Sequence, residues 1–346
     1  MSTVHDVLAV GCGPFNLGLA ALAEPLDLDV AVLEARDAFS WHPGMMLEGA
    51  TIQVPFMADL VTMADPTSRW SFLNYLKLHE RLYPFYIRES FYPLRAEYDA
   101  YCRWVAGELE SVEFGHHVDR VTYDEGRDAF EARCTLADGT QVTRYGRHLV
   151  LGVGTAPHVP ESLADLDGVI HTAEYLDHRD ELAETERVTI VGSGQSAAEV
   201  FHDLLVRRGE DAPGDLTWVT RSPRFFPMEY TKLTLEMTSP EYAAYHRGLP
   251  METRDRLARE QRHLYKGISG DLIDAISDLH YTQRVTGDGP RTTLLTHTAV
   301  TGARWDGDGY DLDLHHAETG EDFGLRTNGL VLATGYGATA PSFLAP

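Results

Sequence analysis

Two short glycine-rich stretches in this chain have the spacing that binds the pyrophosphate of a dinucleotide. They occupy residues 11–16 (GCGPFN) and residues 192–197 (GSGQSA), and each lies between an apolar run and a helical pattern. Glycines at such a junction let the backbone turn sharply and approach an anion at the N-terminus of the helix. One stretch of this kind often reflects tight packing alone. Two of them predict two dinucleotide sites, and therefore a redox enzyme.

The first stretch belongs to a strand-turn-helix-strand pattern. Residues 6–10 are an apolar strand, residues 14–23 a helix, and residues 29–33 a second strand that ends at Glu34. A carboxylate at this strand end, about twenty residues beyond the glycines, can accept hydrogen bonds from a ribose diol. The alternative is a glycine turn that serves packing only, but it does not account for the acid. We therefore predict nucleotide binding here.

The second stretch repeats the pattern but lacks the acid. Residues 188–191 form the strand, residues 195–205 the helix, and residues 216–219 the next strand, which is followed by Arg221. A guanidinium can pair with a ribose 2'-phosphate, whereas a carboxylate would repel it. The second site is thus predicted to prefer NADPH over NADH. The alternative is that Arg221 is an ordinary surface arginine.

Composition is typical of a water-soluble enzyme. The chain has 346 residues, a formal net charge of -24, and no apolar run of the length that spans a bilayer. With no export leader recognisable, we expect a cytoplasmic protein. The negative charge disfavours nucleic acid and anionic membranes as partners and mildly favours cationic substrates.

The three cysteines argue against dithiol chemistry. Cys12, Cys102 and Cys134 are widely separated, so the close pair of a disulfide reductase is missing. Cys12 lies in the first glycine stretch, where a helix dipole can lower a thiol pKa. A small side chain beside a cofactor is the interpretation that we favour for it. No metal site is expected.

The organisation of the chain is duplicated. Short strands from 112 to 153 follow the first nucleotide unit, and a second series from 292 to 333 follows a helical insertion of about 225–281. We predict an α/β fold with two Rossmann-like dinucleotide-binding domains, small antiparallel sheets and a mostly helical substrate segment. This layout resembles that of flavoprotein monooxygenases and reductases, which implies FAD in the first site and NADPH in the second. The expected FAD domain is 1–160 completed by 327–346, and the expected NADPH domain is 161–326.

Further motifs carry a resemblance to a known family. Taken together they resemble the N-hydroxylating flavin monooxygenases of siderophore biosynthesis, which hydroxylate the terminal amine of lysine, ornithine or a diamine. The resemblance covers nearly the whole chain and rests on residues 39–46 (FSWHPGMM), 52–62 (IQVPFMADLVT), 65–68 (DPTS) and 71–76 (SFLNYL), and on 192–199 (GSGQSAAE) paired with 333–336 (ATGY).

The resemblance implies a reaction in which the protein supplies no central acid or base. NADPH would reduce FAD, O2 would add as a flavin hydroperoxide, and a neutral primary amine would attack it. The protein would bind and orient the reactants and exclude water. Because an alkyl ammonium has a pKa of about 10.4, the site must deliver the amine deprotonated. Members of the family are commonly homotetramers, so a homo-oligomer is expected.

The resemblance also implies site residues. Gln53 would face the flavin and the nicotinamide and is the catalytic candidate. For residues 41–42 the alternative is a packed aromatic turn, which an isolated Trp-His pair usually forms. The implied FAD contacts are Gly11, Gly13, Pro14, Asn16, Leu17, Glu34, Trp41 and His42. The implied NADPH contacts are Gly192, Ser193, Gly194, Gln195, Ser196 and Arg221, and the late motif adds Thr334, Gly335 and Tyr336 to the cofactor-binding set.

One departure from the family pattern concerns the substrate. Members that accept amino acids tend to carry a lysine where this chain has Ala58, and that lysine pairs with the α-carboxylate. Leaving a buried carboxylate unpaired costs roughly 3 to 5 kcal/mol. We therefore predict a substrate without a carboxylate, namely a diamine such as cadaverine or putrescine.

A second departure is looser. Leu235 aligns with an asparagine that binds the amino acid in the family, and Glu236 or Asp59 is a candidate partner for the distal ammonium of a diamine. Lys266 is a candidate replacement for the missing cation, which would restore an amino-acid substrate.

Other functions stay open on the sequence. They are L-lysine or L-ornithine N-hydroxylation, oxidation of a carbon or sulfur centre by a related flavin monooxygenase, and a non-catalytic flavin-binding sensor. Family members usually continue for several dozen residues beyond the position of Tyr336, whereas ten residues follow it here. We therefore expect either a fragment or a longer protein, and a substrate contact from such a segment would lie outside these 346 residues.

Overall fold

The computed structural model describes residues 3–208 and 214–344, and its contacts divide the chain into two compact units. The first unit contains the chain up to His42, residues Glu48–Ala156 and the chain from Gly337 onward. The second contains Pro43–Leu47 and Pro157–Tyr336. Each unit is built around its own sheet.

The first unit holds a six-stranded sheet in the order β3-β2-β1-β6-β5-β4. Four of its strands are mutually parallel, while β5 and β4 continue the sheet in antiparallel fashion. Every residue of β2 is buried, as expected for a parallel strand covered on both faces. The strands are β1 (Val4–Val10), β2 (Val30–Leu33), β3 (Val112–Glu113), β4 (His117–Asp124), β5 (Ala129–Thr135) and β6 (Gln141–Leu151).

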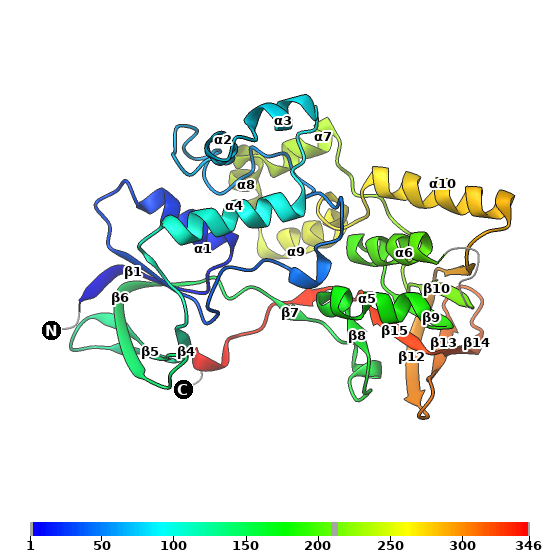
Figure 1. The fold of residues 1–346 in the computed structure, drawn as a ribbon. Coiled ribbons are helices and arrows are strands. Elements are labelled where there is room, and N and C mark those ends of the chain that lie inside the picture. The colour runs from blue at the N-terminus through cyan, green and yellow to red at the C-terminus, as the bar shows by residue number, and fades with distance from the viewer. Residues whose placement is uncertain (1–2, 209–213, 345–346) are drawn as a thin grey trace. The chain divides into compact units, whose positions relative to one another are not determined.

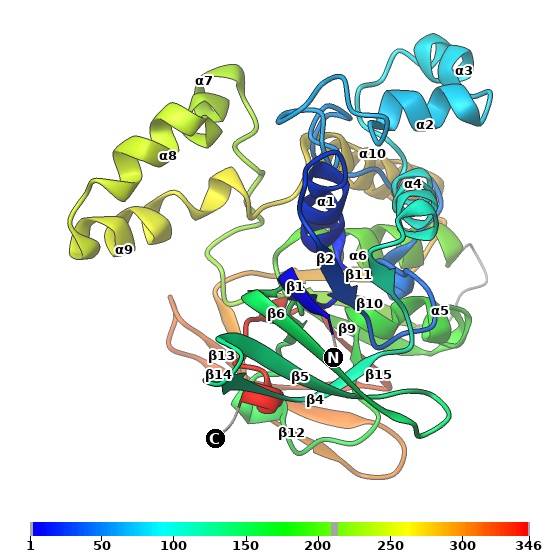
Figure 2. The ribbon, with the colours of Figure 1, turned by 90° about the vertical axis from the view of Figure 1, so that its left-hand side faces the viewer.

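Helices α1 (Pro14–Ala23) and α4 (Arg95–Glu108) lie side by side on one face of this sheet (Figures 1 and 2). Ala9 and Val32 point into the core beneath these helices, whereas Leu8 and Leu33 join a second cluster with residues of β4 and β5. Because side chains alternate along a strand, each strand supplies both layers. Helices α2 (Phe72–Leu78) and α3 (Leu82–Ile87) complete this unit.

The second unit holds a five-stranded parallel sheet in the order β11-β10-β9-β15-β8. Its core on one face is closed by α5 (Tyr175–Glu184), α6 (Gln195–Arg207) and α10 (Gly270–Thr286). A three-stranded antiparallel sheet packs on the other face. The strands are β8 (Ile170–His171), β9 (Arg187–Val191), β10 (Asp215–Val219), β11 (Arg291–Leu295) and β15 (Gly329–Leu332), with β12 (Thr298–Trp305), β13 (Tyr310–His316) and β14 (Asp322–Thr327) in the smaller sheet.

The expected helical segment is present in the second unit. It comprises α7 (Lys232–Leu235), α8 (Pro240–Arg247) and α9 (Met251–Glu260), and none of these helices contains a fully buried residue. Helix α10 extends past the expected end at 281 and packs its apolar side against α6. The remaining short elements are β7 (Ala156–Pro157), β16 (Tyr336–Gly337), and 3-10 turns at Pro43–Met45, Glu161–Leu163, Thr172–Glu174, Glu236–Thr238, Arg262–Leu264 and Ser342–Leu344.

The predicted fold class is confirmed, but the expected domain boundary differs from the structure. Strand β15 lies within the stretch 327–346 that was expected to complete the first domain, yet it pairs with β9 and β8 of the second sheet. Leu330 and Leu332 face the small antiparallel sheet and Val331 faces the helices, so burial on both sides fixes β15 there. Residues 43–47 also group with the second unit. Among residues 3–208 and 214–344, no helix has the length and apolarity to cross a membrane.

Candidate active site

The first glycine stretch forms a tight turn between β1 and α1. Gly11 has a φ of +90°, and a Cβ built on it would lie 2.6 Å from the carbonyl oxygen of Gly152. The buried Asn16 side chain donates from Nδ2 to the carbonyl oxygens of Val10 at 3.2 Å and Gly11 at 2.8 Å. The turn therefore requires glycine at position 11, and Asn16 holds it from within.

Two of the expected FAD contacts consequently face the protein interior. Asn16 uses its amide on the turn, and Leu17 is fully buried in the core. The amide of Leu17 donates to the carbonyl oxygen of Gly13 at 2.9 Å. The Asn16 side chain thus holds the turn and Leu17 packs in the core, and contact of either residue with FAD stays a prediction.

The N-terminus of α1 is suited to an anion. Gly13 is the N-cap, Pro14 occupies the first turn, and no side chain caps the helix. The first amides of a helix lack partners within the helix, and its dipole favours negative charge at this end. Gly13 and Pro14 are therefore placed where a pyrophosphate binds such a turn.

Glu34 lies directly beyond the turn, at the end of β2, and is 5% exposed. Its Oε2 accepts from the amide of Cys12 at 2.7 Å, and its Oε1 accepts from the amide of Arg36 at 3.0 Å and from Nε at 2.8 Å. Burial alone would raise the pKa of Glu34, but these hydrogen bonds outweigh it and hold the pKa below its ordinary value. The group is a carboxylate that can accept from a ribose diol.

Cys12 is an inert thiol. Burial, followed by the negative charge of Glu34, raises the pKa of Cys12 to about 12. The alternative that the helix dipole activates this thiol is therefore not supported. The interpretation that remains is a small side chain that fits a crowded turn.

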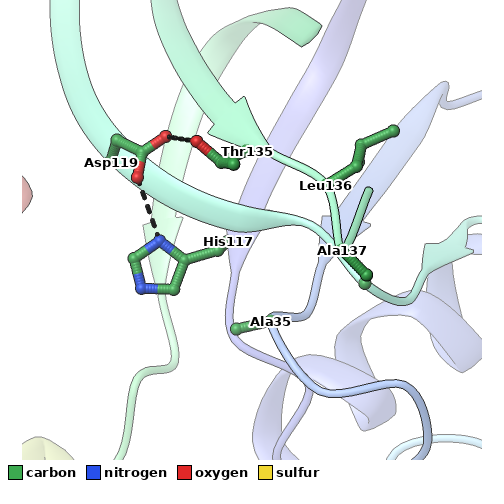
Figure 3. A pocket seen from close by; sticks show the side chains of 7 residues that line it. Ala35, His117, Asp119, Thr135, Leu136 and Ala137 are labelled. Carbon is green, nitrogen blue, oxygen red and sulfur yellow. Dashed lines mark hydrogen bonds and ion pairs between the residues drawn. The ribbon is translucent and has the colours of Figure 1, made fainter. Parts of the chain in front are cut away.

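A hollow of about 280 Å³ opens at the carboxyl edge of β2 and β3, next to Glu34 (Figure 3). Nucleotides bind to open α/β sheets at this edge. Asp119 accepts from Thr135 at 2.6 Å and is hydrogen-bonded to His117 at 3.1 Å in its wall. The lining residues are Ala35, Gly115, His117, Asp119, Thr135, Leu136 and Ala137.

Gln53 has the clearest sign of a missing partner. Its Nε2 atom is buried, and within the described chain it makes no hydrogen bond. A buried amide without an acceptor costs free energy, so such atoms in proteins usually meet a ligand or an ordered water. The carbonyl and ring-nitrogen acceptors of a flavin match this donor. The residues of the first unit therefore fit FAD.

Trp41 and His42 form the aromatic turn expected before Pro43. Their rings meet edge to face at 5.2 Å, and Trp41 also packs on Tyr98 at 5.2 Å. The amide of Trp41 donates to Asp99 at 2.9 Å. His42 is exposed as a residue and has a φ of +46°, while partial burial of its ring lowers the pKa of the imidazole.

The second glycine stretch repeats the geometry at the start of α6. Gly192 has a φ of +151°, and a Cβ on it would collide with the carbonyl oxygen of Ala333. Gly194 is the N-cap without a side-chain cap, and a Cβ there would meet nothing within 4 Å. Open space at a helix N-terminus is what a second pyrophosphate needs. Ser193 and Ser196 flank this point and are half-buried.

Two further expected NADPH contacts differ in their surroundings. Arg221 is exposed and comes two residues after β10, where a 2'-phosphate can reach it. Gln195 is instead engaged within the protein: its Nε2 donates to Glu199 at 2.9 Å, and its Oε1 accepts from the amide of Ser269 at 2.8 Å. The side chain of Gln195 therefore already has partners on two helices.

Residues 334–336 form a turn that is held by His158 and His171, two residues that the sequence analysis did not single out. Thr334 Oγ1 donates to the carbonyl oxygen of His158, and Gly335 has a φ of +84°. The carbonyl oxygen of Gly335 accepts from the amide of His158 at 2.9 Å and meets Nε2 of His171 at 3.1 Å. The ring of Tyr336 packs edge to face on His171 at 5.2 Å. Thr334, Gly335 and Tyr336 are thus brought together with two distant residues.

The residues expected to bind the substrate are mostly exposed. Ala58 is exposed, and in the helical segment Glu236 and Lys266 are exposed while Leu235 is half-buried. Lys266 places its ammonium 5.8 Å from the ring centre of Tyr265. Both charged side chains can therefore meet a polar ligand.

The carboxylate of Asp59, an ammonium partner that the sequence allowed, is already engaged within the protein. Its Oδ1 accepts from the amides of Val61 at 2.9 Å and Thr62 at 2.6 Å. Its Oδ2 accepts from the hydroxyl of Thr62 at 2.7 Å and from the amide of Phe72 at 2.7 Å. The carboxylate clamps the loop to the start of α2. The spacing of Asp59 and Thr62 is a signal for such a turn that the sequence analysis passed over.

His171 gives a testable pH dependence. Because Nδ1 accepts from the amide of Ala173 at 3.1 Å, Nε2 carries the proton toward Gly335, and burial lowers the pKa of His171 below 6.5. A depressed folded-state pKa means that stability is present above the unfolded pKa and is lost as pH falls below it. We expect His171→Asn to be less stable than wild type at pH 8 and this difference to shrink at pH 5, measured by thermal unfolding. An unchanged difference would contradict the neutral tautomer.

Comparison with known proteins agrees with this geometry. The profile of the L-lysine 6-monooxygenase/L-ornithine 5-monooxygenase family matches residues 3–338. The chain belongs to this family. Its expected membership of the N-hydroxylating flavin monooxygenases is thereby confirmed, and so is its class as a flavin-dependent monooxygenase.

Three relatives place the chain within the family. It is 46% identical over 346 residues to a putrescine N-hydroxylase of Shewanella oneidensis, covering 99% of this chain and 69% of that protein. The FAD-bound cadaverine monooxygenase of the desferrioxamine pathway of Erwinia amylovora is 44% identical, with a TM-score of 0.95 over 99% of this chain and 80% of that one. A Kutzneria ornithine N-hydroxylase with reduced FAD, NADP+ and L-ornithine is 29% identical, with a TM-score of 0.91 over 99% and 83%.

Proposed function

We propose that this monooxygenase family member N-hydroxylates one terminal primary amine of a diamine, cadaverine or putrescine, for hydroxamate siderophore biosynthesis. It uses FAD, NADPH and O2. Bound FAD, once reduced by NADPH, supplies the activated oxygen that is transferred to nitrogen. The putrescine N-hydroxylase of Shewanella oneidensis and the cadaverine monooxygenase of Erwinia amylovora both act on diamines, which supports this substrate class.

Ala58 carries the proposal. It lies five residues after Gln53 in an exposed part of the loop, and residues 51–62 contain no lysine, arginine or histidine. An α-carboxylate bound beside Gln53 would find no cation in this loop. Where the bound substrate is buried, leaving its carboxylate unpaired costs roughly 3 to 5 kcal/mol, or about two to four decades of affinity. A second ammonium in place of the amino-acid headgroup has no such requirement.

The residues of the site divide the remaining work. Gly11, Gly13 and Glu34 hold the FAD nucleotide, and Gln53 donates its free N–H to the flavin. Gly192, Gly194 and Arg221 hold NADPH. With Asp59 committed to its loop, Glu236 is the carboxylate that remains to attract the distal ammonium. The reacting amine must shed its proton, which desolvation in a closed site favours.

Replacing Ala58 by lysine tests the substrate assignment. We expect Ala58→Lys to raise kcat/KM for L-lysine or L-ornithine about tenfold or more, because a charge-assisted hydrogen bond is worth about 1.5 to 3 kcal/mol. The same change should lower kcat/KM for diamines through repulsion of the second ammonium. Ala58→Met is the control, since it adds similar length without charge. An unaltered preference in Ala58→Lys would refute the argument from this position.

The amino-acid alternative depends on Lys266. If this exposed lysine replaces the missing cation, Lys266→Met should abolish turnover of lysine or ornithine and leave diamine turnover intact. Under our proposal the wild-type protein turns over neither lysine nor ornithine, so Lys266→Met shows no loss.

Assembly and location are proposed in the same way. The α3 region exposes Tyr83, Tyr86, Ile87 and Phe91, each at 61% or more, which favours a homo-oligomer, a tetramer as in the resembled family. Sedimentation of the FAD-loaded protein tests this. A cytoplasmic location also stays a prediction, and cell fractionation tests it.

A further inference from the structure

The helical segment joins the rest of the second unit through a narrow neck. The neck consists of two chain segments, residues 226–228 and 267–268, which form an isolated β-bridge. The amide of Ile268 donates to the carbonyl oxygen of Phe226 at 3.0 Å, and the amide of Met228 donates to that of Ile268 at 2.9 Å. A Cβ on Gly267 would lie 2.5 Å from the nitrogen of Met228, so the two segments touch there. Ile268 is 1% exposed and belongs to the core of the unit.

Beyond the neck, the described helices of the segment have few buried side chains that could hold them in place. Helices α7, α8 and α9 contain no fully buried residue, whereas Ile268 in the neck and Leu272 and Ile273 in α10 pack in or against the core. A part of a protein with few buried apolar groups opens more easily than its core. The neck therefore governs the position of the helices that carry Leu235 and Glu236.

One side chain links this neck to the second glycine stretch. Gln195, the first residue of α6, accepts a hydrogen bond at Oε1 from the amide of Ser269, which directly follows the neck and caps α10. Its Nε2 is held by Glu199 one turn further along α6. With both ends of the amide engaged, the side chain of Gln195 has a fixed orientation, while its backbone lies at the open N-terminus beside Gly194.

We propose that Gln195 is a positioning residue that couples NADPH binding to the neck of the helical segment. Its backbone lies where NADP+ binds the glycine stretch. Its side chain is hydrogen-bonded to the amide of Ser269, which directly follows the neck. NADP+ bound at the stretch thereby tightens the neck and fixes the helices that meet the amine. The coupling to the amine rests on the proposed function; the coupling to the neck does not.

Two substitutions remove the hydrogen bond between Ser269 and Gln195, one at its acceptor and the other at its donor. Gln195→Leu removes the acceptor at similar size. Ser269→Pro removes the donating N–H without touching the glycine stretch, and it suits the φ of -60° at this position. Ser269→Ala is the matched control, because it keeps the N–H and the Ser269 hydroxyl makes no capping hydrogen bond.

The readout is amide hydrogen exchange of Met228 and Ile268 in the FAD-loaded protein, with and without saturating NADP+. In wild type and Ser269→Ala, NADP+ should slow this exchange about three- to tenfold, the range expected for one hydrogen bond. In Gln195→Leu and Ser269→Pro the slowing should vanish, and in Ser269→Pro, which does not touch the glycine stretch, the Kd for NADP+ should stay within about threefold of wild type. Slowing that persists in either variant, or that is absent from wild type, overturns the coupling. So does a loss of NADP+ affinity in Gln195→Leu with normal neck exchange.

Turnover gives the second readout. Both variants should raise KM for the diamine about three- to tenfold, and Ser269→Pro should leave KM for NADPH unchanged. Since the exchange experiment contains no amine, a protein that fails to turn over diamines but shows NADP+-dependent neck protection would refute the proposed function alone. Effects of the two substitutions should not add in the double variant, because they remove one hydrogen bond.

Discussion

Alanine in place of Gly11 should abolish FAD retention during purification and lower FAD affinity at least tenfold. The added methyl group would lie 2.6 Å from the carbonyl oxygen of Gly152, and a φ of +90° is unfavourable for any residue with a Cβ. The left-handed conformation costs roughly 1 to 2 kcal/mol, and relief of the clash moves backbone that shapes the nucleotide turn. Titration of the apoprotein with FAD, followed by flavin fluorescence, measures the loss.

Gly49→Ala is the matched control for this experiment. Gly49 also has a positive φ, of +77°, but a Cβ there meets nothing within 4 Å. It therefore carries the conformational penalty without the clash. Equal FAD affinity in the two variants would show that the close approach of Gly11 to Gly152 is unimportant for the cofactor.

Asp59→Asn should destabilise the first unit by about 2 to 3 kcal/mol. The carboxylate accepts hydrogen bonds from Val61, Thr62 and Phe72, and an amide nitrogen in place of either oxygen would face donors. Loss of a charged acceptor costs about this much. Urea unfolding of the FAD-loaded protein, followed by flavin release, measures it.

Asp65→Asn is the control for this second experiment. In the described contacts the carboxylate of Asp65 accepts hydrogen bonds only from the amide and hydroxyl of Thr67, and both of these bonds are exposed. Its replacement should cost less than about 1 kcal/mol. Should Asp59→Asn retain wild-type stability but raise KM for the diamine, Asp59 would be the ammonium partner after all.

The sequence predicted the two nucleotide turns because their requirements are local. The positive φ angles of Gly11 and Gly192 follow from strand, turn and helix in succession, and these need no knowledge of distant contacts. The acid at Glu34 is likewise placed by the length of the helix between two strands. These parts of the site were therefore accessible from residue order.

The sequence did not predict which polar side chains are already engaged. Gln195 meets Ser269, 74 residues away, and Asp59 meets Phe72 across a loop, so their roles depend on tertiary structure. The placement of β15 in the second sheet depends on burial from two layers that lie far apart in the chain. His171 escaped notice because a lone histidine has no sequence signature for holding the Gly335 turn.

The most direct test of the account is the amount of hydroxylated amine formed per NADPH consumed, with FAD supplied. Cadaverine, putrescine, L-lysine and L-ornithine should be compared side by side with the wild-type chain. We expect coupled product from a diamine and none from either amino acid. Coupled product from lysine or ornithine would contradict the reading of Ala58, and NADPH oxidation without hydroxylated product from any of the four would contradict the proposed reaction.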